Sequence, residues 1–162
     1  MVPMDLIGVR VEMPANTPVV VLREREGRHR TLPIVIGTPE ASAIHAALSG
    51  VVSPRPLTHD LVVTIIGDLD ATVEQVAITT LRDHIFYAEV HLRVAEEVRI
   101  VSSRPSDAIA IAARVGCPIV ASEALLAEAG QVPPAPSDDA EAIIDEFRDF
   151  LDDLNPDDFR GG

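Results

Sequence analysis

The stretch His84-Ile85-Phe86-Tyr87-Ala88-Glu89-Val90-His91-Leu92-Arg93-Val94 has the strongest structural pattern in the chain. Its side chains alternate in polarity, with Phe86, Ala88, Val90, Leu92 and Val94 set against Tyr87, Glu89, His91 and Arg93. Successive side chains of a strand point to opposite faces, so the pattern predicts a strand with one face in the core. Further strand-like segments at 74–81 and 97–102 flank it closely, which predicts an antiparallel meander.

The remaining strands are predicted from short apolar segments bounded by turn residues, at 4–12, 18–24, 31–36 and 118–121. A hairpin with Gly27 at its turn is expected to join the second and third of these. The connection 23–30 holds four arginines interleaved with Glu24 and Glu26. This mixture of charges favours a solvated hairpin over one that grips a phosphate backbone.

Helices are predicted where apolar residues recur at helical spacing, at 39–50, 58–69, 105–115 and 122–129. The second segment is also compatible with a strand, because its Val62-Val63-Thr64-Ile65-Ile66 core is rich in strand-forming residues. Together these elements predict an α+β fold, in which a mainly antiparallel sheet of meander and hairpins packs with several helices.

Charge and proline content divide the chain into three predicted parts: an α+β domain over 1–130, a proline-rich linker over 131–137 and an acidic helical tail over 138–162. The formal net charge is −13, of which residues 137–162 contribute −8. This balance argues against broad electrostatic binding of nucleic acid, which depends on basic groups. The tail has an apolar stripe and must dock somewhere, so a protein partner is one expectation for it.

Cys117 is the only cysteine, which excludes an intramolecular disulfide and a cysteine-based zinc site. Its apolar neighbours predict a buried small residue rather than a reactive thiol. No run of about 20 apolar residues is present, and the first residues lack the pattern of a signal peptide. A soluble, cytoplasmic protein without membrane contact is therefore expected.

Candidate chemistry lies at two similar helix starts, Arg55-Pro56-Leu57-Thr58-His59-Asp60 and Arg104-Pro105-Ser106-Asp107. One interpretation is helix capping, since proline fits the first turn and Thr, Ser and Asp accept hydrogen bonds from unpaired amides. The other is a binding site, because a helix N-terminus with an arginine and a carboxylate can hold a phosphate or a metal-bound water. Local pattern alone favours capping.

Common catalytic signatures are absent: the nucleophile elbow, the Walker loop, the dinucleotide glycine fingerprint and the zincin motif. A phosphodiesterase would have to bring together groups from separate elements. In such a site carboxylates hold Mg²⁺ or Mn²⁺, a histidine activates water and an arginine stabilises the charge at phosphorus. No organic cofactor is expected.

Five ordered segments resemble the bifunctional nuclease family: Leu32-Pro33-Ile34-Val35-Ile36-Gly37, Glu40-Ala41, Arg55 to Leu61, Phe86-Tyr87-Ala88 and Arg104 to Ala110. The resemblance covers about residues 4–130, and the tail looks like that of actinobacterial members. It implies an α+β domain that assembles into homo-oligomers and a nuclease activity on DNA and RNA.

From the resemblance we expect hydrolysis of phosphodiester bonds with help from a divalent metal. The expected catalytic residues are His59, Asp60, Ser106 and Asp107, with Asp60 and Asp107 also as metal ligands; Arg55, Thr58 and Arg104 are expected to bind substrate. The alternative is a non-enzymatic oligomeric binding or regulatory protein, in which the same residues cap helices and form subunit interfaces.

Overall fold

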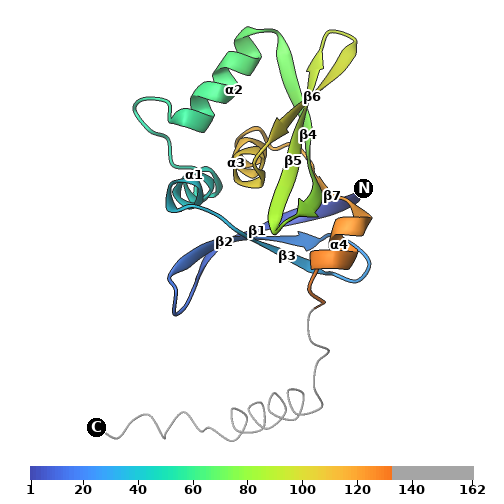
Figure 1. The fold of residues 1–162 in the computed structure, drawn as a ribbon. Coiled ribbons are helices and arrows are strands. Elements are labelled where there is room, and N and C mark those ends of the chain that lie inside the picture. Colours follow the sequence, from blue (N-terminus) through green and yellow to red (C-terminus); the bar gives the residue numbers. More distant parts are fainter. Residues whose placement is uncertain (133–162) are drawn as a thin grey trace, which may run out of the picture. The chain divides into compact units, whose positions relative to one another are not determined.

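One seven-stranded sheet organises residues 1–132, the part of the chain that the computed structural model describes (Figure 1). Its spatial order is β3-β2-β1-β7-β4-β5-β6. The strands are β1 (Val2–Glu12), β2 (Thr17–Glu24), β3 (Thr31–Val35), β4 (Ala71–Arg82), β5 (Ile85–Val94), β6 (Glu97–Ser103) and β7 (Ile119–Ala121). The α+β prediction is confirmed. The predicted acidic helix lies outside the described residues, so the division into three parts stays a prediction.

The meander β4-β5-β6 is antiparallel throughout, as the alternating pattern predicts. The prediction that this strand begins at His84 is wrong: β5 begins at Ile85, and His84 belongs to the turn before it. Arg82 pairs with Ile85, and both intervening residues, Asp83 and His84, have positive φ values of 50° and 63°. A two-residue hairpin loop of this kind needs left-handed backbone at both positions, which ends the strand pattern there.

Strand β7 joins the two halves of the sheet. It pairs antiparallel with β1 and parallel with β4. All other strand pairs of the sheet in residues 1–132 are antiparallel between sequence neighbours. The three residues of β7 are all buried, as the apolar segment after Pro118 predicts.

The four predicted helices are present: α1 (Thr38–Leu48), α2 (Thr58–Asp68), α3 (Pro105–Val115) and α4 (Glu123–Ala129). Helices α1, α2 and α3 lie at one side of the sheet (Figure 1), and α3 packs against α1, α2, β4 and β5. Seven of its residues are buried, most of them alanine or isoleucine. Small side chains let α3 come close to the sheet, so its N-terminus is held firmly.

The ambiguous segment after Thr58 is helical. None of the eleven residues of α2 is buried, although its sequence is strongly apolar. A strand of this composition needs partners on both sides, whereas α2 satisfies its own backbone hydrogen bonds at the rim of the domain. None of the helices in residues 1–132 is long and apolar enough to span a bilayer.

The hairpin between β2 and β3 contains a buried ion pair, so the prediction of a solvated hairpin is wrong for two of its residues. Glu24 and Arg30 are only 5% and 6% exposed. The guanidinium of Arg30 donates to Glu24 Oε1 at 2.8 Å and to Glu123 of α4 at 2.9 Å. This arginine therefore fastens α4 to the end of β2, a long-range contact that local charge patterning does not reveal. Cys117 is partly buried against the core, and burial raises the pKa of its thiol.

We expect acid stability to depend on Glu24. Hydrogen bonds from Arg30 lower the pKa of Glu24 from 4.5 to about 2. A carboxyl whose pKa is lower in the folded state contributes stability that is present above its unfolded pKa and is lost as the pH falls through its folded pKa. The free energy of unfolding in urea should therefore decrease as the pH falls from 4.5 towards about 2.

Glu24→Gln should flatten this decrease, and the matched variant Glu26→Gln, at an exposed position of the same hairpin, should keep it. An unchanged pH dependence in Glu24→Gln would contradict the role given to this ion pair.

Candidate functional site

The N-terminal ends of α1, α2 and α3 meet around one hollow of about 530 Å³. We call it the dyad hollow, after the pair of His59 and Asp107 that lies in its wall. Its walls are formed by Pro39, Glu40, Ser42, Ala43, Ala46, Leu57, Thr58, His59, Arg104 and Asp107. Each helix begins here with no side-chain hydrogen bond from its N-cap residue. Unpaired amides and the positive ends of three helix dipoles therefore surround the hollow, which favours an anionic ligand.

A chain of alternating charges crosses the hollow and links the three helices. Arg104 donates to Asp107 Oδ2 from Nε at 2.7 Å and lies 3.0 Å from Glu40 Oε1 through Nη2. Asp107 Oδ1 in turn lies 3.0 Å from His59 Nε2. The two predicted helix starts therefore face each other, and His59 and Asp107 form a dyad across 48 residues of sequence.

The carboxylate of Asp107 determines which ring nitrogen of His59 carries the proton. Burial raises the pKa of Asp107, but hydrogen bonds from Arg104 and His59 outweigh it and leave that pKa below its usual value. An ionised carboxylate only accepts hydrogen bonds, so Nε2 of His59 carries the proton. Neutral His59 thus keeps its lone pair on Nδ1. Its side chain is 12% exposed, which limits competition from water.

Glu40 is a site residue that the prediction missed. It stands in the first turn of α1, where a carboxylate is favoured by the helix dipole. Gly37 leaves room for it, because a Cβ at that position would collide with Oε2 of Glu40. The segment Gly37-Thr38-Pro39-Glu40 indicates from the sequence a carboxylate in the first turn of a helix. Only the fold shows that this carboxylate faces Arg104.

Asp60 does not join the dyad. Its Oδ1 accepts a hydrogen bond from Arg114 Nε, and its Oδ2 accepts one from the Leu57 amide at 2.8 Å. Both bonds lower the pKa of Asp60, with that from Arg114 as the larger cause. Arg114 also donates to the carbonyl oxygens of Ala43 and Ala110. Asp60 therefore fixes the start of α2 to α3 and α1, in agreement with the capping interpretation.

Three other predicted residues lie in different surroundings. Thr58 is exposed at the wall of the dyad hollow. Arg55 is exposed in the connection before α2 and makes no ion pair within residues 1–132. Ser106 is buried and faces a second hollow on the other side of Arg104. The structure thus brings Thr58, His59, Arg104 and Asp107 together and leaves Arg55 and Ser106 outside that group.

The carboxylates that were expected to hold Mg²⁺ or Mn²⁺ do not fit that purpose in this arrangement. Both oxygens of Asp107 and both of Asp60 accept hydrogen bonds, mainly from arginine. Within residues 1–132, no three His, Cys, Asp or Glu side chains lie together as a metal site would need. A hard divalent cation takes several oxygen ligands, so it would first have to displace an arginine.

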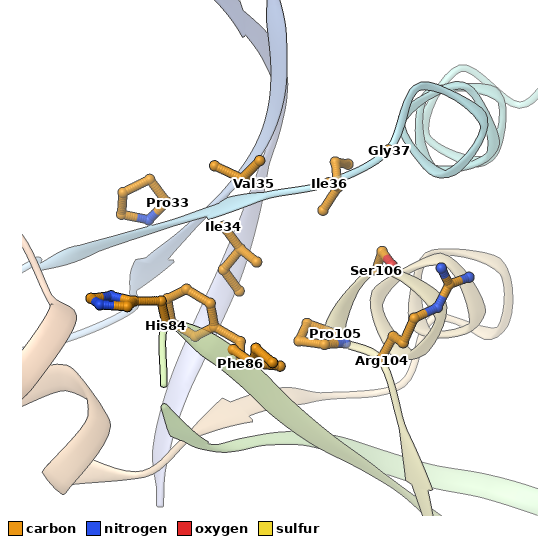
Figure 2. A pocket seen from close by; sticks show the side chains of 11 residues that line it. Pro33, Ile34, Val35, Ile36, Gly37, His84, Phe86, Arg104, Pro105 and Ser106 are labelled. Carbon is orange, nitrogen blue, oxygen red and sulfur yellow. The ribbon is translucent and has the colours of Figure 1, made fainter. Parts of the chain in front are cut away.

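The second hollow, of about 390 Å³, adjoins the first through Arg104, which lines both. Figure 2 shows its apolar walls, formed by the end of β3, the start of β5 and the first residues of α3. The residues that line it are Pro33, Ile34, Val35, Ile36, Gly37, His84, Ile85, Phe86, Arg104, Pro105 and Ser106.

We expect Asp60→Asn to weaken the attachment of α2 to α3. Loss of one charged partner of Arg114 should lower the free energy of unfolding by about 1–2 kcal/mol. Hydrogen exchange of the α2 amides should become faster than in the wild type. Asp68→Asn, at an exposed position near the other end of α2, should change neither quantity. Unchanged exchange in Asp60→Asn would contradict the docking role.

Comparison with known proteins identifies the family. A family model described as the bifunctional nuclease domain matches residues 20–134. An uncharacterized protein of Mycobacterium tuberculosis is 45% identical over 161 residues, with 96% of both chains covered, which agrees with the actinobacterial resemblance. Bifunctional nuclease 2 of Arabidopsis thaliana is 32% identical over 103 residues, or 62% of this chain, and bifunctional nuclease 1 is 28% identical over 145 residues, or 83%. These matches span 31% and 45% of the two plant proteins. The chain belongs to the bifunctional nuclease domain family.

Proposed function

We propose that this protein is a cytoplasmic nuclease that hydrolyses phosphodiester bonds of DNA or RNA at the dyad hollow. The observation that carries the proposal is the 3.0 Å contact between His59 Nε2 and Asp107 Oδ1, at the meeting point of three helix N-termini. The hollow thus combines a histidine in a defined tautomer with an environment that favours a phosphate. Membership of the bifunctional nuclease family supports the same activity.

In the proposed reaction His59 acts as the general base. Nδ1 accepts a proton from a water molecule while the water oxygen attacks phosphorus and the bond from phosphorus to the leaving oxygen breaks. The leaving oxygen takes a proton from solvent. Asp107 stabilises the imidazolium that forms, because its carboxylate accepts the hydrogen bond from Nε2. Once His59 is protonated, the two negative charges of Glu40 and Asp107 are balanced by the two positive charges of Arg104 and His59.

The phosphate is held by backbone amides and by Arg104. The Nε and Nη2 atoms of Arg104 are committed to Asp107 and Glu40, whereas Nη1 makes no hydrogen bond within residues 1–132. Its N–H groups and the unpaired amides at the starts of α1, α2 and α3 are therefore the donors for phosphate oxygens. Glu40 and Asp107 act on the arginine together and hold its guanidinium plane in place.

A non-enzymatic binding or regulatory role is the second candidate. It is favoured because Arg104 and Arg114 already pair with carboxylates of the protein, as arginines with a purely structural role would. In that case the dyad would stabilise the domain and would not take part in bond cleavage.

Hydrolysis of a labelled single-stranded RNA and DNA by highly purified full-length protein tests the proposed activity. His59→Ala should lower the rate by about 100- to 10,000-fold, because general-base catalysis is lost. Asp107→Asn should also lower the rate, because the tautomer of His59 is no longer fixed. His45→Ala, at an exposed position of α1, is the matched control and should retain the full rate. Equal trace activity in all four proteins would identify a contaminant and favour the second candidate.

Addition of EDTA tests the expected metal in the same assay. Because the carboxylates are held by arginines, we expect the rate to stay within about twofold of its value without EDTA. A loss of activity that Mg²⁺ or Mn²⁺ restores would contradict this expectation and would assign Asp107 to a cation.

We further propose that copies of this chain assemble through α2. An exposed apolar stripe follows this helix from its N-cap to its C-cap residue and consists of Leu57, Leu61, Ile65 and Leu69. The edge strand β6 also has exposed Val98, Ile100 and Val101 and no partner on its outer side within residues 1–132. Large exposed apolar patches of this kind mark association surfaces.

The double variant Leu61→Ser, Ile65→Ser should therefore elute as a monomer in size-exclusion chromatography with light scattering, whereas the wild type elutes as an assembly. Ile7→Ser, at an equally exposed position of β1, should leave the assembly intact. A monomeric wild type would contradict the proposed assembly.

A further inference from the structure

The second hollow has one hydroxyl group, that of Ser106, among mainly apolar lining residues. Ser106 is 7% exposed, lines the hollow and makes no hydrogen bond through its hydroxyl within residues 1–132. In Figure 2 it stands at the wall opposite Ile34, beside Pro105. No fully buried side-chain nitrogen or oxygen within residues 1–132 lacks a hydrogen-bond partner, so the Ser106 hydroxyl is open to the hollow and available to a ligand. The amides of Ser106 and Asp107 are also free of a capping side chain.

Most of the other lining residues are apolar, which favours an apolar group. Ile34, Ile36, Phe86 and Pro105 surround the hollow (Figure 2), and Ile85 also lines it. Its volume of about 390 Å³ lies within the range of small-ligand pockets. A ligand here meets aliphatic and aromatic surfaces on its faces and one hydroxyl with adjacent amides at its edge. A serine hydroxyl both donates and accepts, so it suits an edge that carries ring nitrogens and carbonyl oxygens.

We propose that this hollow seats one nucleobase of the nucleic acid whose phosphate lies in the dyad hollow. The inference rests on the proposed function and adds a subsite to it. Arg104 lines both hollows, so a base in the second hollow places its own or the next phosphate beside the guanidinium. The base edge contacts Ser106, and the faces contact Ile34 and Phe86.

The charge of the protein supports a base-directed site. With a net charge of −13, contacts to phosphate alone supply little affinity. Burial of a base against apolar and aromatic side chains supplies binding energy that does not depend on positive charge. A base can enter only when it is neither paired nor stacked, so the bound chain is single-stranded at this position.

Fluorescence anisotropy with two labelled hexanucleotide probes tests the proposal. One probe is hexathymidylate, and the other has the same sugar-phosphate backbone without bases. Full-length protein with His59→Ala is used so that neither probe is cleaved. We expect the probe with bases to bind at least about tenfold more tightly than the abasic one, as expected for one stacked base. Equal affinities, or no binding of either probe, would overturn the proposal.

Two substitutions in the same background locate the binding. Ser106→Ala removes only the hydroxyl, and Ile85→Ser removes an apolar wall at a position that is 58% exposed and therefore tolerant of change. Each should weaken binding of hexathymidylate by about five- to tenfold and leave the abasic probe unaffected. Ile7→Ser on β1, at a position that is 51% exposed, is the matched control and should change neither affinity. Unchanged binding in both pocket variants would overturn the assignment.

The result is separable from that of the hydrolysis assay. Binding that depends on bases and on Ser106, together with absence of cleavage by the wild type, would keep the base subsite and reject the nuclease activity. Cleavage that depends on His59 without a base-dependent affinity would do the reverse.

Discussion

The contact of the Asp107 carboxylate with both Arg104 and His59 is the interaction on which the candidate site depends. It fixes the tautomer of the histidine, orients the arginine through two hydrogen bonds and, with Glu40, joins the starts of α1, α2 and α3. These contacts add to the packing of α3 against α1 and α2 and to the ion pair between Asp60 and Arg114. The unpaired backbone amides at these helix starts add hydrogen-bond donors to those of the side chains.

Two features allow this contact to form. The alanine-rich face of α3 packs closely on the sheet, so Arg104 and Asp107 stand on a rigid support. The ion pair of Arg114 with Asp60 then holds the otherwise unburied α2 against α3, which keeps His59 within reach of Asp107. Asp60 thus serves the site indirectly. The two helix starts therefore differ: Asp60 secures its own helix, and Asp107 contacts the histidine.

The proposed function requires an acidic protein to recognise a nucleic acid. Its arginines are mostly paired with carboxylates, so long-range attraction to a phosphate backbone is weak. Helix N-termini and an apolar hollow provide attraction that acts only at short range. In the proposed function, such a surface would select a chain that presents one phosphate and one unstacked base together, rather than a regular duplex.

The sequence by itself determined the secondary structure, the α+β class and the two helix starts as the places of interest. These are local properties: the alternation in β5, the helical spacing in α3 and the order of motifs along the chain. Only the tertiary structure decided which of those residues meet. It showed that Glu40 belongs to the site, that Asp60 pairs with Arg114, and that Arg30 is buried with Glu24. The physical reason is that ion pairs between residues far apart in sequence leave no periodic pattern, because they depend on how β7 joins the two halves of the sheet and on where α3 then places its first turn.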